Sequence, residues 1–207
     1  MSSKQYFDEV AQQWDTMRKG FFSENVREKA LTTANVQPGK LAADLGAGTG
    51  FITEGLVKKS VNVIAVDQSA EMLAAMQQKF AEARGIEYRQ GTAENLPIED
   101  KTVDYAFANM YLHHVESPSN AIKEMARILK PIGKLVITDL DEHHFEFLRT
   151  EQYDRWMGFK RSDISRWFTE AGLNNVKVDC VGENCCTQSE CGSEQAAVSI
   201  FVAVGEQ

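Results

Sequence analysis

The stretch that decides the fold runs from Leu41 to Gly50 and reads LAADLGAGTG. Its first residues have the apolar character of a buried strand, and the acidic Asp44 lies just before the turn that follows. That turn carries three alternate glycines, Gly46, Gly48 and Gly50. Because glycine has no Cβ, this spacing predicts a tight turn that a ligand can approach closely. Residues 51–59 suit a helix, so the turn would lie at a helix N-terminus.

A second apolar run, Val61–Val66, follows the first helix and ends in Asp67. A glycine turn after one strand and a carboxylate at the end of the next are typical of sites for nucleoside-containing ligands. The side chain of Asp67 would accept hydrogen bonds from ribose hydroxyls. These two features predict a nucleoside site over the first strand, turn and helix.

Composition narrows the class of protein. A chain of 207 residues with 43% hydrophobic and 25% charged residues is expected to form one domain, residues 1–207, with a substantial core. The net charge of -8 argues against a nucleic-acid partner, which would favour a basic face. The polar N-terminus resembles no targeting segment, and no apolar run reaches membrane-spanning length. We therefore expect a cytoplasmic protein with no membrane partner and with free thiols.

Strand and helix patterns alternate from about residue 40 onward, which predicts a doubly wound, Rossmann-like α/β fold. Seven segments are expected as strands: Leu41–Leu45, Val61–Val66, Ile86–Gln90, Val103–Ala108, Lys134–Thr138, Lys177–Val181 and Ala197–Val204. Four are expected as helices: Ile52–Lys59, Ala70–Arg84, Ser119–Leu129 and Ser162–Ala171. The sheet should be mostly parallel. Its last strand should be antiparallel, because only a loop over residues 182–195 connects it to the strand before.

The first 38 residues precede the sheet and are expected to form two helices that cap its edge. Tyr6, Phe7, Val10 and Trp14 recur near helical spacing. Tyr6 and Trp14 either close over the ligand as a lid or serve as packing residues.

With this order of elements, the chain resembles the class I S-adenosylmethionine-dependent methyltransferases, in particular the small-molecule group related to the quinone-biosynthesis enzymes. Four segments in the expected order carry the resemblance: DLGAGTG (44–50), VDQSAEML (66–73), GTAENLPIEDKTVDYAFANMYLHHV (91–115) and EMARILKPIGKLVITDL (124–140). It implies S-adenosylmethionine as cofactor, S-adenosylhomocysteine as product and a small-molecule substrate.

Nicotinamide dehydrogenases are the rival interpretation of the glycine turn. Their G-x-G-x-x-G pattern seats a pyrophosphate, whereas the third glycine here comes one residue early. The carboxylate of Asp44 would repel a pyrophosphate but would suit a cationic sulfonium and its amino group. The charge before the turn therefore favours S-adenosylmethionine.

The resemblance also implies which residues hold the cofactor. Gly46, Ala47 and Gly48 would line the methionine moiety and ribose, Asp67 would bind the ribose hydroxyls and Gln68 would lie against the adenine. The turn at Thr92, Ala93 and Glu94 would flank the adenine edge, although family members often carry Asp at the first of these positions. Asn109 would face the methionine moiety. The full expected set is Asp44, Gly46, Ala47, Gly48, Gly50, Asp67, Gln68, Thr92, Ala93, Glu94 and Asn109.

Ligands of open parallel sheets bind outside the carboxyl ends of the strands, and this edge gathers the histidines. His113 and His114 follow the fourth strand, and His143 and His144 follow the fifth. A histidine has a suitable pKa for the base in a methyl transfer. His113 and His114 are thus candidates for that base, or structural residues that line the pocket.

Three cysteines, Cys185, Cys186 and Cys191, follow the sixth strand at the same edge. Histidine and thiolate together form the soft ligand set for zinc, copper(I) or thiophilic metalloids, with His144 as a further candidate ligand. The C-C-x4-C spacing is not that of a zinc finger, and adjacent cysteines do not easily chelate one tetrahedral ion. It suits a trigonal thiolate site, a redox pair or a loop without such a role.

The preferred hypothesis is methyl transfer from S-adenosylmethionine to a small-molecule acceptor. The alternatives are methylation of a metalloid or thiol held by the three cysteines, and a non-enzymatic sensor that keeps the cofactor fold. An apolar and aromatic segment over residues 145–159 either shapes the acceptor pocket or packs on the sheet, and an apolar acceptor would suit it. The residues leave the acceptor, its reacting atom and the oligomeric state open.

Overall fold

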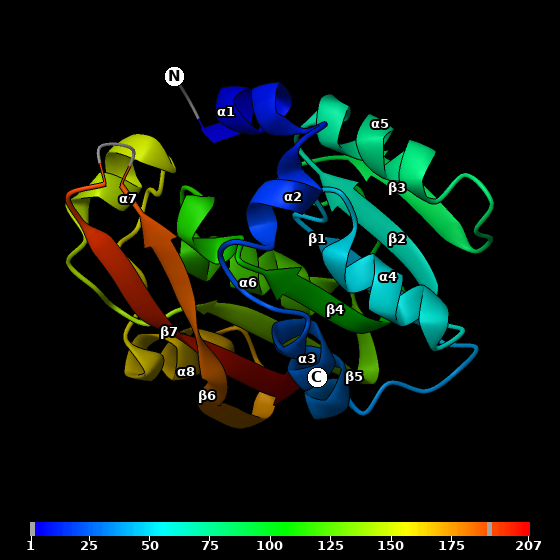
Figure 1. The fold of residues 1–207 in the computed structure, drawn as a ribbon. Helices are drawn as coiled ribbons and strands as arrows, with labels where there is room; N and C mark the ends of the chain where they lie inside the picture. The colour runs from blue at the N-terminus through cyan, green and yellow to red at the C-terminus, as the bar shows by residue number, and fades with distance from the viewer. Residues whose placement is uncertain (1–2, 190–191) are drawn as a thin grey trace.

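A seven-stranded sheet with the strand order β3-β2-β1-β4-β5-β7-β6 runs through the molecule (Figure 1). The computed structural model describes residues 3–189 and 192–207. The strands are β1 (Leu41–Leu45), β2 (Asn62–Asp67), β3 (Ile86–Gln90), β4 (Val103–Asn109), β5 (Leu129–Leu140), β6 (Asn174–Gln188) and β7 (Gln195–Glu206). β1 to β5 pair in parallel, and β7 runs antiparallel to both β5 and β6. The expected mostly parallel sheet with an antiparallel last strand is confirmed.

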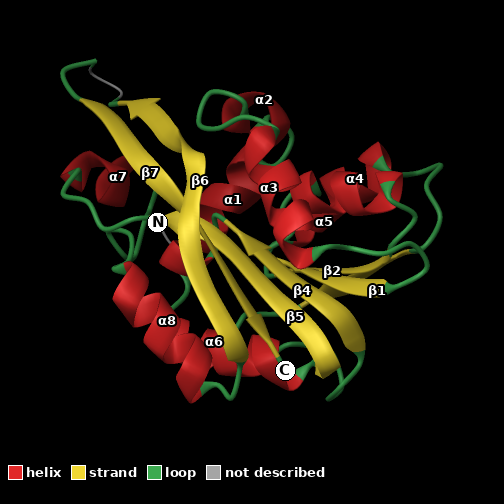
Figure 2. Cartoon of the chain, turned by 90° about the horizontal axis from the view of Figure 1, so that it is seen from below, coloured by secondary structure: helices red, strands yellow, loops and turns green. Residues whose placement is uncertain are grey.

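Helices cover both faces of this sheet (Figure 2). One face carries α3 (Asn25–Ala34), α4 (Phe51–Lys58) and α5 (Ala70–Lys79), and the other carries α6 (Pro118–Arg127) and α8 (Arg161–Glu170). Each face has its own apolar core, because side chains of a strand alternate between the two sides. In β1, Ala42 packs under the first group of helices, whereas Ala43 and Leu45 pack under the second.

The helix boundaries follow local capping chemistry. Ser69 caps α5, as its position suggests, since its Oγ accepts a hydrogen bond from the Met72 amide at 3.0 Å. The helix is shorter than the expected Ala70–Arg84, because Phe80 leaves helical dihedral angles at φ −106° and ψ 25°. Two short elements were not anticipated: the 3₁₀ turn η1 (Leu112–His114) and α7 (Glu146–Glu151).

The largest difference from the sequence prediction lies in β6. The segment 182–195 is not one long loop, because β6 continues to Gln188 and β7 begins at Gln195. Cys185 pairs with Val198 and Cys186 pairs with Ala197 across this extension. The polar sequence GENCCTQ forms a strand because backbone pairing with β7 satisfies its amides and carbonyls.

Residues 3–38 form three helices, not two. α3 packs on the face of the sheet, whereas α1 (Ser3–Val10) and α2 (Trp14–Arg18) cross the carboxyl edge of the strands (Figure 1). Asp8 accepts a hydrogen bond from Ser69 Oγ at 2.6 Å, and Asp15 accepts one from Thr49 Oγ1 at 2.6 Å. The two helices are thus tied to the loops that follow β1 and β2.

No helix in the described part of the chain combines the length and the apolar character needed to span a membrane.

Candidate active site

The glycine turn connects β1 to α4 and is anchored to the neighbouring strand. The amides of Gly46 and Ala47 both donate to the carbonyl of Val66, at 2.8 and 3.0 Å. Gly46 has φ +66°, and a Cβ at this position would lie 2.3 Å from the ring of Tyr111. Only glycine allows this backbone conformation and this contact together. The turn is therefore held in one shape by β2 on one side and an aromatic ring on the other.

Asp67 ends β2 beside this turn, and its carboxylate is held by backbone amides. Oδ2 accepts from Gly48 N at 2.8 Å, and Oδ1 accepts from Ser69 N at 2.9 Å. Its side chain is buried, and burial raises its pKa despite these amide bonds. The structure thus brings together the two features from which a nucleoside site was expected.

A cavity opens above the turn, which we call the glycine-turn cavity. Asp67, Gln68 and Asn109 line it, together with Gly46, Ala47, Gly48 and Thr49. Trp14 from α2 covers it, because the indole nitrogen lies 3.6 Å from where a Cβ of Gly48 would stand. The rest of its wall is Phe7, Arg18, Phe22, Phe51, Met72, Met110, Tyr111 and His114.

Asp44 lies behind the turn and is not among the described residues that line this cavity. Its Oδ2 accepts hydrogen bonds from Thr53 N at 2.9 Å and Thr53 Oγ1 at 2.7 Å. Burial raises its pKa to about 6. The carboxylate that was expected to attract the ligand's positive charge instead fastens β1 to the first turn of α4.

The turn at Thr92, Ala93 and Glu94 is also separate from the described cavity lining. Thr92 is exposed and Ala93 is buried. The Glu94 carboxylate accepts the amides of Glu116 and Ser117 at 3.0 and 3.3 Å. Tyr111 links this turn to the cavity: burial and the charges of Asp67 and Glu94 raise the pKa of its phenol.

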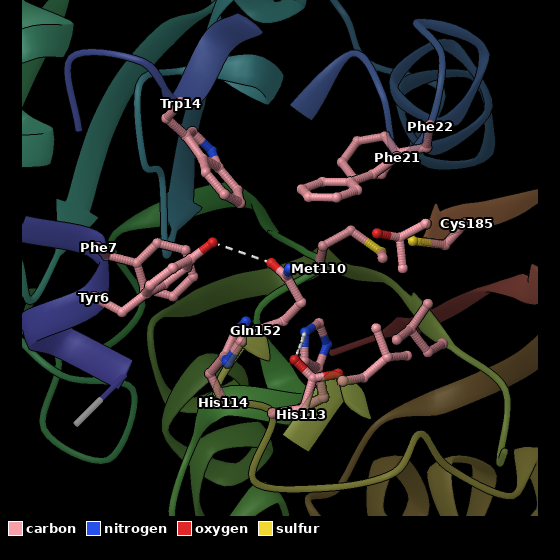
Figure 3. A pocket seen from close by; sticks show the side chains of 14 residues that line it. Tyr6, Phe7, Trp14, Phe21, Phe22, Met110, His113, His114, Gln152 and Cys185 are labelled. Carbon is pink, nitrogen blue, oxygen red and sulfur yellow. Dashed lines mark hydrogen bonds and ion pairs between the residues drawn. The ribbon is translucent and has the colours of Figure 1, made fainter. Parts of the chain in front are cut away.

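A second cavity adjoins the first, and half of its lining residues carry rings, so we call it the aromatic cavity (Figure 3). Its wall consists of Tyr6, Phe7, Trp14, Phe21, Phe22, Met110, His113, His114, Leu140, Leu148, Gln152, Asp154, Cys185 and Thr187. The Tyr6 hydroxyl donates to Gln152 Oε1 at 3.1 Å, which joins α1 to the segment after α7. Five residues line both cavities: Phe7, Trp14, Phe22, Met110 and His114.

His113 is buried between two carboxylates. Its Nδ1 lies 2.6 Å from Asp139 Oδ1, and its Nε2 lies 3.7 Å from Asp154 Oδ1. Burial alone would lower the pKa of His113, but the two carboxylates outweigh it and raise the pKa to about 9. At neutral pH the imidazole of His113 is therefore protonated and ion-paired. A protonated imidazole has no lone pair to accept a proton, so His113 does not suit the role of general base.

His114 has the opposite character although it is the next residue. Burial and the positive charge of His113 lower its pKa well below the usual histidine value. Its Nδ1 lies 3.4 Å from the carbonyl of Tyr153, which can only accept, so the tautomer with a proton on Nδ1 is favoured. The ring packs edge-on against Phe7 and lines both cavities. It is a neutral imidazole, and within residues 3–189 and 192–207 no hydrogen-bond donor meets its Nε2 lone pair.

The cysteines and the remaining histidines do not converge with this pair. Cys185 faces the aromatic cavity, where burial raises the pKa of its thiol to about 12, whereas Cys186 is exposed. Neighbouring side chains of a strand point to opposite faces, so these two thiols do not share one ion. Cys191 lies outside the described residues. His144 is exposed and lines a separate cavity with His143.

Comparisons with known proteins match the chain to methyltransferases. A family model described as a methyltransferase domain matches residues 43–137. The chloroplastic 2-methyl-6-phytyl-1,4-hydroquinone methyltransferase 2 of Oryza sativa subsp. japonica is 33% identical over 167 residues, which cover 79% of this chain and 47% of that protein. The chain spans about half the length of the curated relatives it matches.

Solved structures share the fold. The YcgJ protein from Bacillus subtilis superposes with a TM-score of 0.75 at 18% identity, covering 89% of this chain and 99% of that one. Haemonchus contortus phosphoethanolamine N-methyltransferase 2, solved with S-adenosyl-L-methionine, gives a TM-score of 0.72 at 16% identity, covering 87% of this chain and 52% of that one.

Proposed function

Because this chain belongs to the class I S-adenosylmethionine-dependent methyltransferases, we propose that it transfers a methyl group from that cofactor to a small, largely apolar acceptor in the aromatic cavity. The observation that carries the proposal is the wall shared by the two cavities. A donor above the glycine turn and an acceptor among the rings would meet at Met110 and His114. An in-line methyl transfer needs the reactants held adjacent in this way.

The residues of the first cavity fit S-adenosylmethionine. When bound, the cofactor supplies an electrophilic methyl group on a sulfonium. The buried carboxylate of Asp67 suits a pair of ribose hydroxyls, and the glycine turn lines the same cavity with Gly46, Ala47 and Gly48. Gln68 and Asn109 line the same cavity and offer polar groups to the rest of the molecule.

The second cavity suits an apolar or aromatic acceptor. Rings from α1, α2 and the segment after it surround the space, and such rings exclude water and hold a flat molecule in place. The neutral His114 would accept a proton from the acceptor atom as it is methylated. The charged His113 would act as a positioning residue that keeps its neighbour neutral.

The cysteine-based alternative has less support. This alternative requires three thiols on one site. Among the described residues, Cys185 faces the aromatic cavity, whereas Cys186 is exposed. The structure offers no converging thiolate pair among the described residues.

The test is turnover. The full chain is incubated with S-adenosylmethionine and single acceptors from the quinol, phenol, amine and thiol classes, and S-adenosylhomocysteine is measured by mass spectrometry. We expect acceptor-dependent product with a ring-containing acceptor and a rate about 10²- to 10⁴-fold lower in His114→Gln. Tight binding of S-adenosylhomocysteine without turnover on any class would favour a sensor instead.

A further inference from the structure

We propose that His113, His114 and Asp154 form a binding site for one divalent transition-metal ion at the edge of the aromatic cavity. One possible ligand atom from each of these residues lies within 4.8 Å of the other two. A bound zinc ion would hold such atoms about 3 to 3.5 Å apart, given metal–ligand bonds of about 2.1 Å. Small side-chain rotations would therefore close the site around an ion.

The first argument is the orientation of His113. Asp139 Oδ1 holds its Nδ1 at 2.6 Å, so Nε2 is directed toward Asp154. Asp139 is itself fixed, because it accepts the amides of Leu112 and Leu140 at 2.8 and 2.7 Å. A carboxylate on the far nitrogen is the usual support of a metal-binding histidine, since it sets the tautomer and the ring direction.

The second argument is that the backbone already holds the three residues together. His113 and His114 are consecutive in η1, whereas Asp154 comes from the segment after α7. The amides of Arg155 and Trp156 both donate to the carbonyl of His113 at 3.0 Å. These two bonds keep the carboxylate of Asp154 beside the imidazoles without any ligand.

The third argument is chemical. Two imidazoles and one carboxylate are the ligand set that iron(II), zinc, cobalt and manganese share, and they leave coordination positions open. His113 and Asp154 are both buried, and a second buried carboxylate, Asp139, adds negative charge behind them. A divalent ion would balance the two carboxylates in a place where water cannot screen them.

The open positions of the ion would face the acceptor. His113, His114 and Asp154 all line the aromatic cavity, and Figure 3 shows the two imidazoles side by side, across the cavity from Trp14 and Phe21. Resting on the proposed function, the ion would bind an oxygen or nitrogen atom of the acceptor and favour its deprotonated form. Binding would displace the proton from His113 Nε2. His114 Nε2 would then be a ligand of the ion, so the ion would replace His114 as the group that activates the acceptor.

The experiment is a titration of the chelator-treated full chain with ZnCl₂ alone by calorimetry, repeated with CoCl₂ under absorption spectroscopy. We expect one ion per chain and a cobalt spectrum of nitrogen and oxygen ligands. His114→Ala and Asp154→Asn should each abolish this binding, and Asp139→Asn should weaken it about 10- to 100-fold. His144→Ala is the matched control, because it removes an exposed histidine outside the cluster.

Absence of binding by the folded wild-type chain would overturn the proposal, as would equal loss of binding in His144→Ala. Circular dichroism identifies any variant that fails to fold. The wild-type cobalt spectrum keeps the proposal testable in that case, because sulfur ligation in it would assign the ion to a cysteine instead. Titration with S-adenosylhomocysteine in parallel separates the two proposals. If the chain binds the cofactor product but no metal, the metal site is overturned and the proposed function is not.

Discussion

The amide of Gly48 donates to the carboxylate of Asp67 across 2.8 Å, so the end of β2 and the glycine turn are one connected unit before any ligand arrives. This bond fixes both the side chain that would take the ribose hydroxyls and the backbone beside it. A preorganised site of this kind loses little conformational entropy on binding.

Asp67→Ala should therefore weaken binding of S-adenosylhomocysteine by about 10- to 150-fold, the range for one lost hydrogen bond to a charged group. Calorimetric titration measures the change. Asp104→Asn is the control, because this carboxylate bonds to Leu41 N and Lys130 away from the cavity. Unchanged affinity in Asp67→Ala would remove the carboxylate from the cofactor site.

Gly46→Ala should disrupt the same site through Tyr111. The added methyl would stand 2.3 Å from the tyrosine ring on a backbone at φ +66°, and we expect a loss of stability of about 1–3 kcal/mol with weaker cofactor binding. Gly39→Ala is the matched control, since it has φ +76° and no atom within 4 Å of the new methyl. Chemical denaturation compares the two, and equal losses would mean that the ring contact is unimportant.

Trp14→Ala should speed the release of bound S-adenosylhomocysteine and raise its dissociation constant about tenfold, because the indole covers Gly48. Stopped-flow displacement measures the release rate. Trp167→Ala is the control, since Trp167 packs on Phe159 on the other side of the sheet. If both variants release the ligand at the wild-type rate, α2 is a packing element, which was the other interpretation of Trp14.

The sequence predicts the positions of the glycine turn and of Asp67 well and the lining of the aromatic cavity less well. The glycine turn and Asp67 are encoded in short segments whose strand ends and spacing are local properties. Asp44 belongs to the same motif, but the direction of its side chain depends on the hydrogen bond from Thr53. No pattern in the sequence indicates that contact. The β6 extension was missed because its polar residues pair with β7 through backbone groups.

The difference between His113 and His114 also lies beyond sequence reasoning. The two residues look equivalent as a dipeptide, yet one meets Asp139 and Asp154 and the other meets Phe7 and the Tyr153 carbonyl. Asp154 carried no signal in the sequence, because only tertiary folding brings it to η1. The sequence places Asp139 at the end of a strand, but it does not indicate which side chain this carboxylate contacts.

The paired charges of His113 predict a pH dependence of stability. Its pKa is raised from 6.5 to about 9 in the folded, metal-free protein, so the protonated form stabilises the fold of the chelator-treated chain. That contribution is complete below pH 6.5 and is lost as the pH rises through 9, by about 3 kcal/mol. The free energy of unfolding of wild type minus that of His113→Gln should fall across this window. A constant difference would contradict the buried ion pair, and His144→Gln supplies the control.

The extension of β6 predicts unequal reactivity of two neighbouring thiols. Cys186 is exposed and should be alkylated by iodoacetamide, whereas Cys185 faces the aromatic cavity and its raised pKa leaves little thiolate. We expect alkylation of Cys186 at least about tenfold faster, measured by peptide mass spectrometry after short exposures. Cys185→Ser and Cys186→Ser assign the signals. Equal rates would mean that the strand opens in solution and that the segment behaves as the loop its composition suggested. The metalloid alternative would then regain support, because a loop could turn both thiols to one side.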